Sequence, residues 1–207
     1  DHKIGLIVDE WGTWYDVEEG TNPGFLYQQN TIRDALVAAI NLNIFNKHCD
    51  RVKMANIAQL VNVLQAVILT EGDQMVKTPT YYVFNMYKHH QNGTLIESFV
   101  DTKTIGLEKD YQVPNLHESV SKDENGKYHI TLANLSVSED YEISADLLDN
   151  RVKSAKAEIL TGKMDDKNTF DDPDCVKISA FEGVKTEGDK ITFTIPKNSV
   201  MHIEVEL

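Results

Sequence analysis

The chain has 207 residues, of which 33 are acidic and 20 basic, so its formal net charge at neutral pH is −13. This acidity argues against a nucleic-acid binder, because neutralising phosphates requires a basic face. The longest apolar run, residues 60–69, is interrupted by Asn62 and Gln65, so no transmembrane helix and no membrane partner are expected. The length suits one large domain or two modest ones.

The first half of the chain predicts a strand, a helix and a second strand. Residues 4–8 are nearly continuously apolar and end at Asp9 and Glu10, which is typical of a strand buried on both faces of a parallel sheet. Helical apolar spacing predicts a helix from about residue 30 or 31 to residue 46, with Asn30 or Thr31 as N-cap. Residues 51–57 predict the second strand, so the segment forms one βαβ unit with parallel strands.

The next segment is less regular. Polar residues recur every third position over 57–69, which suits a helical turn followed by a strand, but the period alone leaves this open. Thr78 and Pro79 predict the start of a second helix that ends at Gly93. The aromatic residues of this helix are expected to pack on a sheet. His89 and His90 are expected to be a surface pair near its C-terminal end.

After Gly93 the pattern changes to short alternating strands joined by turns, which predicts an antiparallel β-sandwich. In the last strand we expect Met201, Ile203 and Val205 to be buried and His202 to lie on the opposite, polar face. Net charge changes at the same place, from −3 over residues 1–93 to −10 over residues 94–207. The sequence therefore predicts an α/β part over 1–93 and an all-β part over 94–207.

Residues 9–15 carry the strongest chemical signal, because two carboxylates and three large aromatic side chains follow a predicted buried strand. Sites in parallel α/β folds lie at this end of the strands, and aromatic rings beside carboxylates suit sugars. An acidic loop with ordinary core aromatics explains the pattern about equally well. No phosphate loop, serine elbow or paired-cysteine motif is present. His48 beside Cys49 lacks a second matching group, so no metal site and no cofactor are predicted.

Residues 8–15, Val-Asp-Glu-Trp-Gly-Thr-Trp-Tyr, closely resemble the nucleophile segment of family 51 glycoside hydrolases, the α-L-arabinofuranosidases. The likeness continues through residues 33–36, 50–63 and 81–84, and through residues 168–173 and 196–207 of the second half. It therefore covers nearly the whole chain.

The resemblance implies a retaining glycosidase whose catalytic domain is a (β/α)8 barrel. This chain would carry the last two strand–helix units of the barrel over residues 1–93, followed by an antiparallel, jelly-roll-like β-sandwich domain over residues 94–207. Glu10 matches the catalytic nucleophile, Trp14 an aromatic residue beside the arabinose subsite, and Gln59 a side chain that hydrogen-bonds the sugar. The acid/base residue of the family, in an Asn-Glu pair on the fourth barrel strand, has no counterpart here.

We therefore expect the chain to be a fragment that is inactive by itself, since a (β/α)8 barrel needs about 250 residues. Its expected partners are the missing N-terminal barrel segment and an arabinose-containing polysaccharide or oligosaccharide, such as arabinan or arabinoxylan. Self-association as a homo-oligomer is expected if the missing segment does not cover the cut strands. The alternative is a non-catalytic carbohydrate-binding or interaction module formed by the β-rich half.

Overall fold

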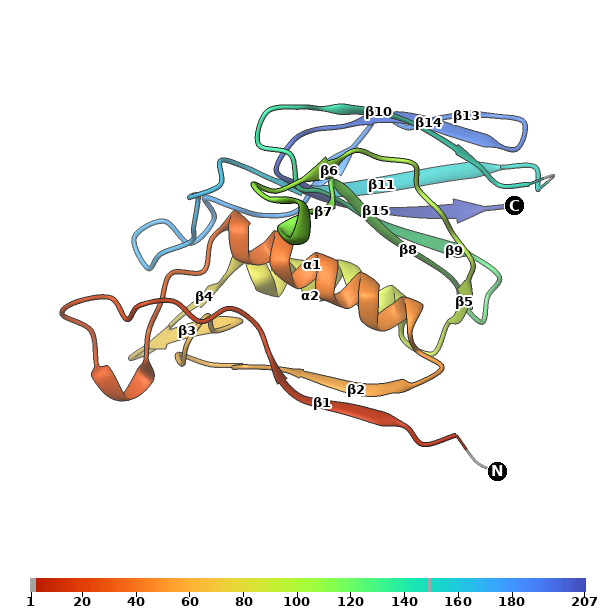
Figure 1. The fold of residues 1–207 in the computed structure, drawn as a ribbon. Helices are drawn as coiled ribbons and strands as arrows, with labels where there is room; N and C mark the ends of the chain where they lie inside the picture. The colour runs from red at the N-terminus through yellow and green to blue at the C-terminus, as the bar shows by residue number, and fades with distance from the viewer. Residues whose placement is uncertain (1–2, 149) are drawn as a thin grey trace.

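The computed structural model describes residues 3–148 and 150–207. Three layers are visible in Figure 1: a pair of strands near the N-terminus, two helices in the middle, and a sandwich of two sheets. No helix in the described part of the chain combines the length and the apolar character that a membrane crossing would require.

The chain begins with the predicted βαβ unit. Strands β1 (Leu6–Trp11) and β2 (Val52–Ile57) pair in parallel, and helix α1 (Ile32–Lys47) connects them. Thr31 is the N-cap of α1, and the Asp34 side chain accepts a hydrogen bond from the Thr31 backbone N–H at 2.8 Å, which completes a capping box. The strand pairing, the helix and its N-cap residue are therefore as the sequence predicts.

Between β2 and the second helix the chain forms an irregular loop and a hairpin of β3 (Ile68–Glu71) and β4 (Gln74–Lys77). No helical turn is present over 57–67, so that part of the interpretation of this segment is wrong. Helix α2 (Pro79–Tyr87) begins at the predicted proline but ends earlier than predicted, because the chain tightens into the 3-10 helix η2 (Lys88–His90).

The largest sheet is six-stranded, in the order β12-β11-β15-β9-β8-β5, and every pairing in it is antiparallel. Its strands are β5 (Thr94–Ile96), β8 (Leu116–Lys122), β9 (Tyr128–Asn134), β11 (Ser154–Thr161), β12 (Ser179–Phe181) and β15 (Ser199–Glu206). A three-stranded sheet of β10 (Tyr141–Asp146), β14 (Lys190–Ile195) and β13 (Lys185–Glu187) lies over one of its faces. The remaining short elements are η1 (Pro23–Phe25), η3 (Lys109–Tyr111) and the paired strands β6 (Thr104–Ile105) and β7 (Val113–Pro114).

The two faces of the six-stranded sheet have different cores. Between the sheets, a cluster of buried aliphatic and aromatic side chains fills the sandwich, including Ile191, Ile195, Met201 and Ile203. On the other face, α1 and α2 share a second core with Ala133, Leu160 and Val200 of the sheet. Both faces of the sheet are therefore covered.

The covered second face corrects two expectations. His202, expected on a polar outer face, is only 5% exposed because the helices lie over it. His89 and His90 are not a simple surface pair: the His90 ring bonds Ser121 Oγ at 2.7 Å and Thr131 Oγ1 at 2.9 Å. Alternation in the sequence shows the two faces of a strand, but it does not show that a helix covers the polar face.

The outer side of the β1–β2 pair is open in this chain. Ile4, Leu6, Ile7 and Met54 are each about half exposed or more, although the apolar run predicts burial on both faces. The prediction of a parallel strand is correct, whereas burial is incomplete because no further strand or layer among the described residues covers this side.

Candidate active site

Parallel pairing brings the ends of β1 and β2 to one edge. Trp11 is opposite Ile57, and the Ala58 backbone N–H donates to the Trp11 carbonyl at 3.0 Å. Glu10 is the next-to-last residue of β1, and Gln59 lies two residues beyond β2. Both side chains are exposed, so this edge presents a carboxylate and an amide to the solvent side.

Trp11 anchors the end of β1 next to Glu10. Its ring meets Phe45 edge-on at 5.4 Å between centroids and stacks on Phe84 at 6.1 Å, so this end of β1 packs on both helices. The pairing of β1 with β2 is irregular between Val8 and Trp11, and Glu10 lies in this irregular stretch with its side chain exposed. Within the described residues, no side chain forms a hydrogen bond or an ion pair with the Glu10 carboxylate.

The loop after β1 is held by buried polar side chains. The Thr13 hydroxyl lies 2.9 Å from Asp34 Oδ1 and 2.6 Å from Gln65 Oε1. Gln28 donates to Thr13 Oγ1 at 3.1 Å and accepts from the Tyr15 backbone N–H at 2.7 Å. Asp34, Gln65 and Gln28 are all at most 2% exposed, so the side chains that hold the loop of Trp14 are buried.

Arg33 and Asp34 connect this loop to α1. The Arg33 guanidinium lies 3.8 Å from the centroid of the Tyr15 ring and donates to Asp34 Oδ2 at 3.1 Å. Asp34 thus serves both the helix N-terminus and the loop. The sequence analysis does not predict this role, although a charged residue such as Asp34 at a buried helical position indicates a specific partner.

Trp14 lies on the loop that leaves the edge occupied by Glu10. Its side chain is 69% exposed, and with Tyr15, Asp16 and Val17 it lines a shallow open depression. The structure therefore places Glu10 and Gln59 at the same strand edge, with Trp14 on the adjoining loop. Whether these three residues act on a substrate stays a prediction.

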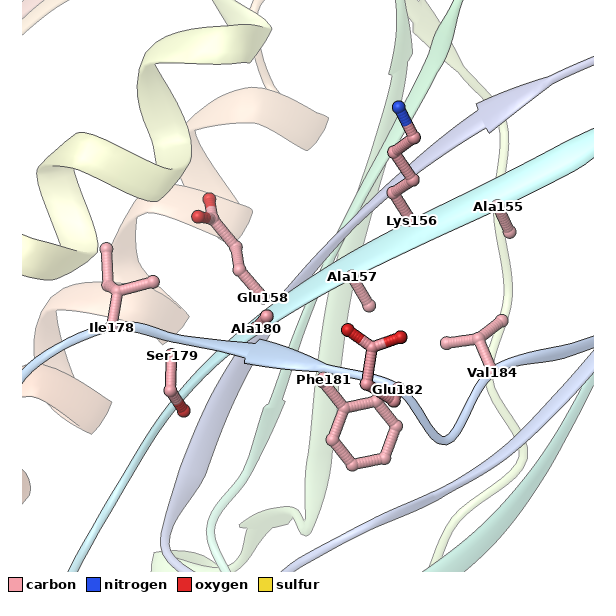
Figure 2. A pocket seen from close by; sticks show the side chains of 10 residues that line it. All are labelled: Ala155, Lys156, Ala157, Glu158, Ile178, Ser179, Ala180, Phe181, Glu182 and Val184. Atoms are coloured by element: carbon pink, nitrogen blue, oxygen red, sulfur yellow. The ribbon is translucent and has the colours of Figure 1, made fainter.

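A second hollow, of about 540 Å³, lies along β11 and β12, in a different sheet from β1 and β2. Figure 2 shows Ala157 and Phe181 among its lining residues, with Glu158 pointing toward the helices. None of the predicted site residues lines it, so it offers no support for the sugar site.

Three histidines that are remote in the sequence meet under α2. His89, His129 and His202 each offer a ring nitrogen, and these atoms all lie within 4.8 Å of one another. Burial lowers the pKa of His89, and the neighbouring His202 and His129 lower it further. The sequence predicts no metal ligands, and it gave no local signal for this cluster because its members come from η2, β9 and β15.

Comparison with known proteins decides the family. The family model for the α-L-arabinofuranosidase C-terminal domain matches residues 9–199. The chain belongs to this family. The resemblance to family 51 that the sequence motifs indicate is therefore confirmed.

The relatives agree in name and in fold. An intracellular exo-α-L-arabinofuranosidase of Bacteroides ovatus is 45% identical over the whole chain. The crystal structure of the family 51 arabinofuranosidase from Xanthomonas axonopodis pv. citri is 43% identical, covers 98% of the chain and superposes with a TM-score of 0.92. The arabinose complex of the Thermotoga maritima enzyme is 28% identical, covers 99% of the chain and has a TM-score of 0.82.

The matches cover only part of each relative. The chain spans 40% of the Bacteroides ovatus protein, 41% of the Xanthomonas chain and 43% of the Thermotoga chain. These shares fit a family description that names a C-terminal domain.

Proposed function

We propose that this chain is the C-terminal part of a retaining α-L-arabinofuranosidase that releases terminal arabinofuranosyl groups from arabinan or arabinoxylan. The names of its relatives support the activity, and its 45% identity to one of them over the full chain supports a shared substrate class. Activity belongs to the complete protein, because the chain spans about two fifths of the relatives that it matches.

Residues 1–93 supply the last two strand–helix units of a (β/α)8 barrel in this proposal, and residues 94–207 form the jelly-roll-like sandwich domain. The parallel β1–β2 pair with both helices on one side supports the barrel assignment, since barrel helices form the outer ring. Glu10 is exposed at the end of β1, and in this proposal its carboxylate faces the inside of the barrel.

Glu10 is the nucleophile. Its carboxylate attacks the anomeric carbon while the glycosidic bond breaks, and a second carboxyl group about 5–5.5 Å away protonates the departing oxygen. The same second group then removes a proton from water, which attacks the anomeric carbon and releases both the sugar and Glu10. That acid/base comes from a segment outside this chain.

Trp14 and Gln59 position the sugar. A tryptophan ring offers an apolar face to the C–H groups of the arabinose, and Gln59 offers both a donor and an acceptor to its hydroxyls. Neither residue exchanges a proton in the reaction.

The observation that carries the proposal is the exposed Glu10 carboxylate at the carboxyl edge of a parallel strand pair. Essentially all (β/α)8 enzymes have their catalytic groups at this edge. A structural carboxylate would be expected to have a partner within the chain, and the described residues provide none for Glu10.

The test is Glu10→Ala in the complete polypeptide, with an aryl arabinofuranoside as substrate. We expect activity to fall by at least about 10³-fold, because the covalent route is removed. Added azide should restore turnover and yield an arabinofuranosyl azide of inverted configuration, which marks Glu10 as the nucleophile.

The matched control is Asp9→Asn, the neighbouring exposed carboxylate of β1. It should keep most of the activity. Full activity of Glu10→Ala would contradict the assignment. So would a loss of activity that Glu10→Ala and Asp9→Asn share and that azide does not restore in Glu10→Ala.

A carbohydrate-binding role for the sandwich is the second candidate. It is favoured by Phe99 and Tyr111, which are 89% and 76% exposed on the segment between β5 and β8. Affinity electrophoresis of the whole chain in arabinan separates the two roles. Strong retardation that Phe99→Ala or Tyr111→Ala removes would support the binding module, and unretarded migration would exclude it for arabinan.

A further inference from the structure

The three histidines under α2 come from three different elements. His89 lies on η2, His129 on β9 and His202 on β15, directly across from Thr131 of β9. His129 and His202 are 2% and 5% exposed, whereas His89 is half-buried. The cluster therefore has two deeply buried members and one that reaches solvent.

The outer nitrogens of the two buried rings face carboxylates. His202 Nδ1 lies 3.1 Å from Glu158 Oε1, and His129 Nε2 lies 3.3 Å from Asp123 Oδ2. An ionised carboxylate can only accept, so each of these ring nitrogens carries the hydrogen and donates it. Figure 2 shows Glu158 directed toward the helix side of β11, which is the side of the cluster.

The inner nitrogens are left with lone pairs that face each other. His129 Nδ1 and His202 Nε2 are 3.1 Å apart. In neutral imidazoles whose outer nitrogens donate, both inner nitrogens are acceptors, and two acceptors at this distance repel. A cation between them removes the conflict. Histidine held by a carboxylate on one nitrogen, with the other nitrogen free, is the usual arrangement around protein-bound metals.

His89 completes a three-nitrogen set. Its ring lies over both others, with centroids 4.5 Å from His202 and 5.0 Å from His129. Ligand nitrogens around tetrahedral zinc are about 3.3 Å apart, so the His89 nitrogen has to move inward by up to about 1.5 Å, and its ring has to tilt out of the stacked orientation. The half-buried position of His89 on a short surface element leaves room for that movement.

Charge agrees with a divalent ion. Asp123 and Glu158 place two carboxylates beside the buried rings, which favours a divalent cation there.

We propose that His89, His129 and His202 bind one Zn²⁺, with water in the fourth position and Asp123 and Glu158 as supporting carboxylates. The ion joins η2, at the end of the helical layer, to two central strands of the six-stranded sheet. It is a structural site, separate from the edge that carries Glu10.

The test measures zinc binding to the complete polypeptide that contains this chain, with any histidine tag removed. Zinc binding is measured in a protein that also carries Cys49→Ser and Cys175→Ser, because both thiols are exposed and a free thiolate is a zinc ligand. After dialysis against a small excess of Zn²⁺, we expect one zinc per chain by elemental analysis. At zinc about 100-fold above its Kd, Tm of the complete polypeptide should rise by about 2–5 °C.

Two variants probe the cluster. His89→Ala removes the accessible ligand and should abolish both the zinc binding and the rise in Tm. Glu158→Gln keeps all three ligands and should weaken zinc binding about 10- to 100-fold. Both residues are partly exposed, so both variants should fold. The Tm and the circular dichroism spectrum of each variant without zinc check this. His48→Ala, an exposed histidine outside the cluster, is the matched control and should bind zinc like the parent.

Three outcomes would overturn the proposal. One is less than one zinc per chain, and another is binding that survives His89→Ala or disappears in His48→Ala. The third is a Tm that rises on acidification and does not respond to zinc, since a shared proton then occupies the histidine pair in the folded state.

Discussion

At the scale of single residues, Gly12 determines how the strand of Glu10 turns into the loop of Trp14. Its φ is +142°, a region that favours glycine, and a Cβ there would lie 1.7 Å from Gln65 Nε2. Gln65 is buried and contacts Thr13, so it has little freedom to withdraw. A side chain at position 12 therefore conflicts with the backbone conformation and with the support of the loop.

We predict that Gly12→Ala lowers the free energy of unfolding by about 2–4 kcal/mol, because strain and a steric clash act together. Gly72→Ala is the matched control: Gly72 also has a positive φ, +58°, but a Cβ there meets open space. It should cost about 1 kcal/mol. Urea unfolding of the two variants provides the comparison, and equal losses would show that the contact with Gln65 does not matter.

The sequence identifies some of the candidate site residues for a physical reason. Glu10 and Gln59 follow predicted parallel strands, and parallel strands end at one edge, so their proximity is predictable. Gln28 and Gln65 could not be assigned, because their partners are Thr13 and Tyr15, which are remote in sequence. Motif resemblance pointed to residues 33–36 without explaining them, and the Arg33–Tyr15 and Asp34–Thr13 contacts supply the reason.

At the scale of elements, local signals were sufficient for both helix starts. Thr31 with Asp34 forms a capping box, and Pro79 occupies the first turn of α2, and both depend only on neighbouring residues. The β3–β4 hairpin was missed although Gly72 and Asp73 mark its turn. The three-residue polar period over 57–69 suggested a helical turn, whereas those polar side chains serve contacts with distant segments, as Gln65 does with Thr13.

Part of the helix-facing side of the six-stranded sheet is polar and yet buried. Asn43 of α1 donates to the His117 carbonyl at 3.0 Å and accepts from the Ser119 hydroxyl at 2.8 Å and the Thr131 hydroxyl at 2.9 Å. Polar residues on alternate strand positions therefore bond a helix rather than water. Alternation predicts which side chains share a face, but it does not predict what lies over that face.

Strand β8 provides a pH prediction. Burial lowers the pKa of His117. The unfolded chain takes up a proton near pH 6.5 and the folded chain only at lower pH, so the free energy of unfolding falls as pH drops below about 6.5. We expect His117→Gln to make the stability curve flatter below that pH. Urea unfolding from pH 7.5 to 5 measures this, with the exposed His48→Gln as control, and identical slopes in all three proteins would refute it.

At the scale of the whole molecule, the proposed reaction needs two carboxyl groups, and this chain supplies only Glu10. We therefore predict that the purified 207-residue chain releases no arabinose from arabinan or from an aryl arabinofuranoside. Co-expression with the N-terminal barrel segment should restore activity. Detectable arabinose release by the chain alone would contradict the proposal that the acid/base residue lies outside this chain.

The open side of the β1–β2 pair predicts self-association of the isolated chain. Exposed apolar side chains such as Ile7 and Met54 lie next to unpaired strand edges, an arrangement that favours edge-to-edge contacts. Light scattering should detect species larger than a monomer, and Ile7→Lys should reduce them. Val137→Lys, at an exposed apolar position outside the β1–β2 pair, is the control. A monodisperse monomer of the chain without substitutions would contradict the prediction.

The core that α1 and α2 share with the six-stranded sheet has a consequence for protein engineering. A chimera that joins one relative's sandwich to another's barrel at residue 93 would place Asn43 and His90 against a sheet that did not evolve with them. The transferable module is the sandwich together with its two helices. Recombination between family members should therefore succeed more often with a crossover before residue 31 than with a crossover at residue 93, the boundary that the charge and strand patterns of the sequence predict.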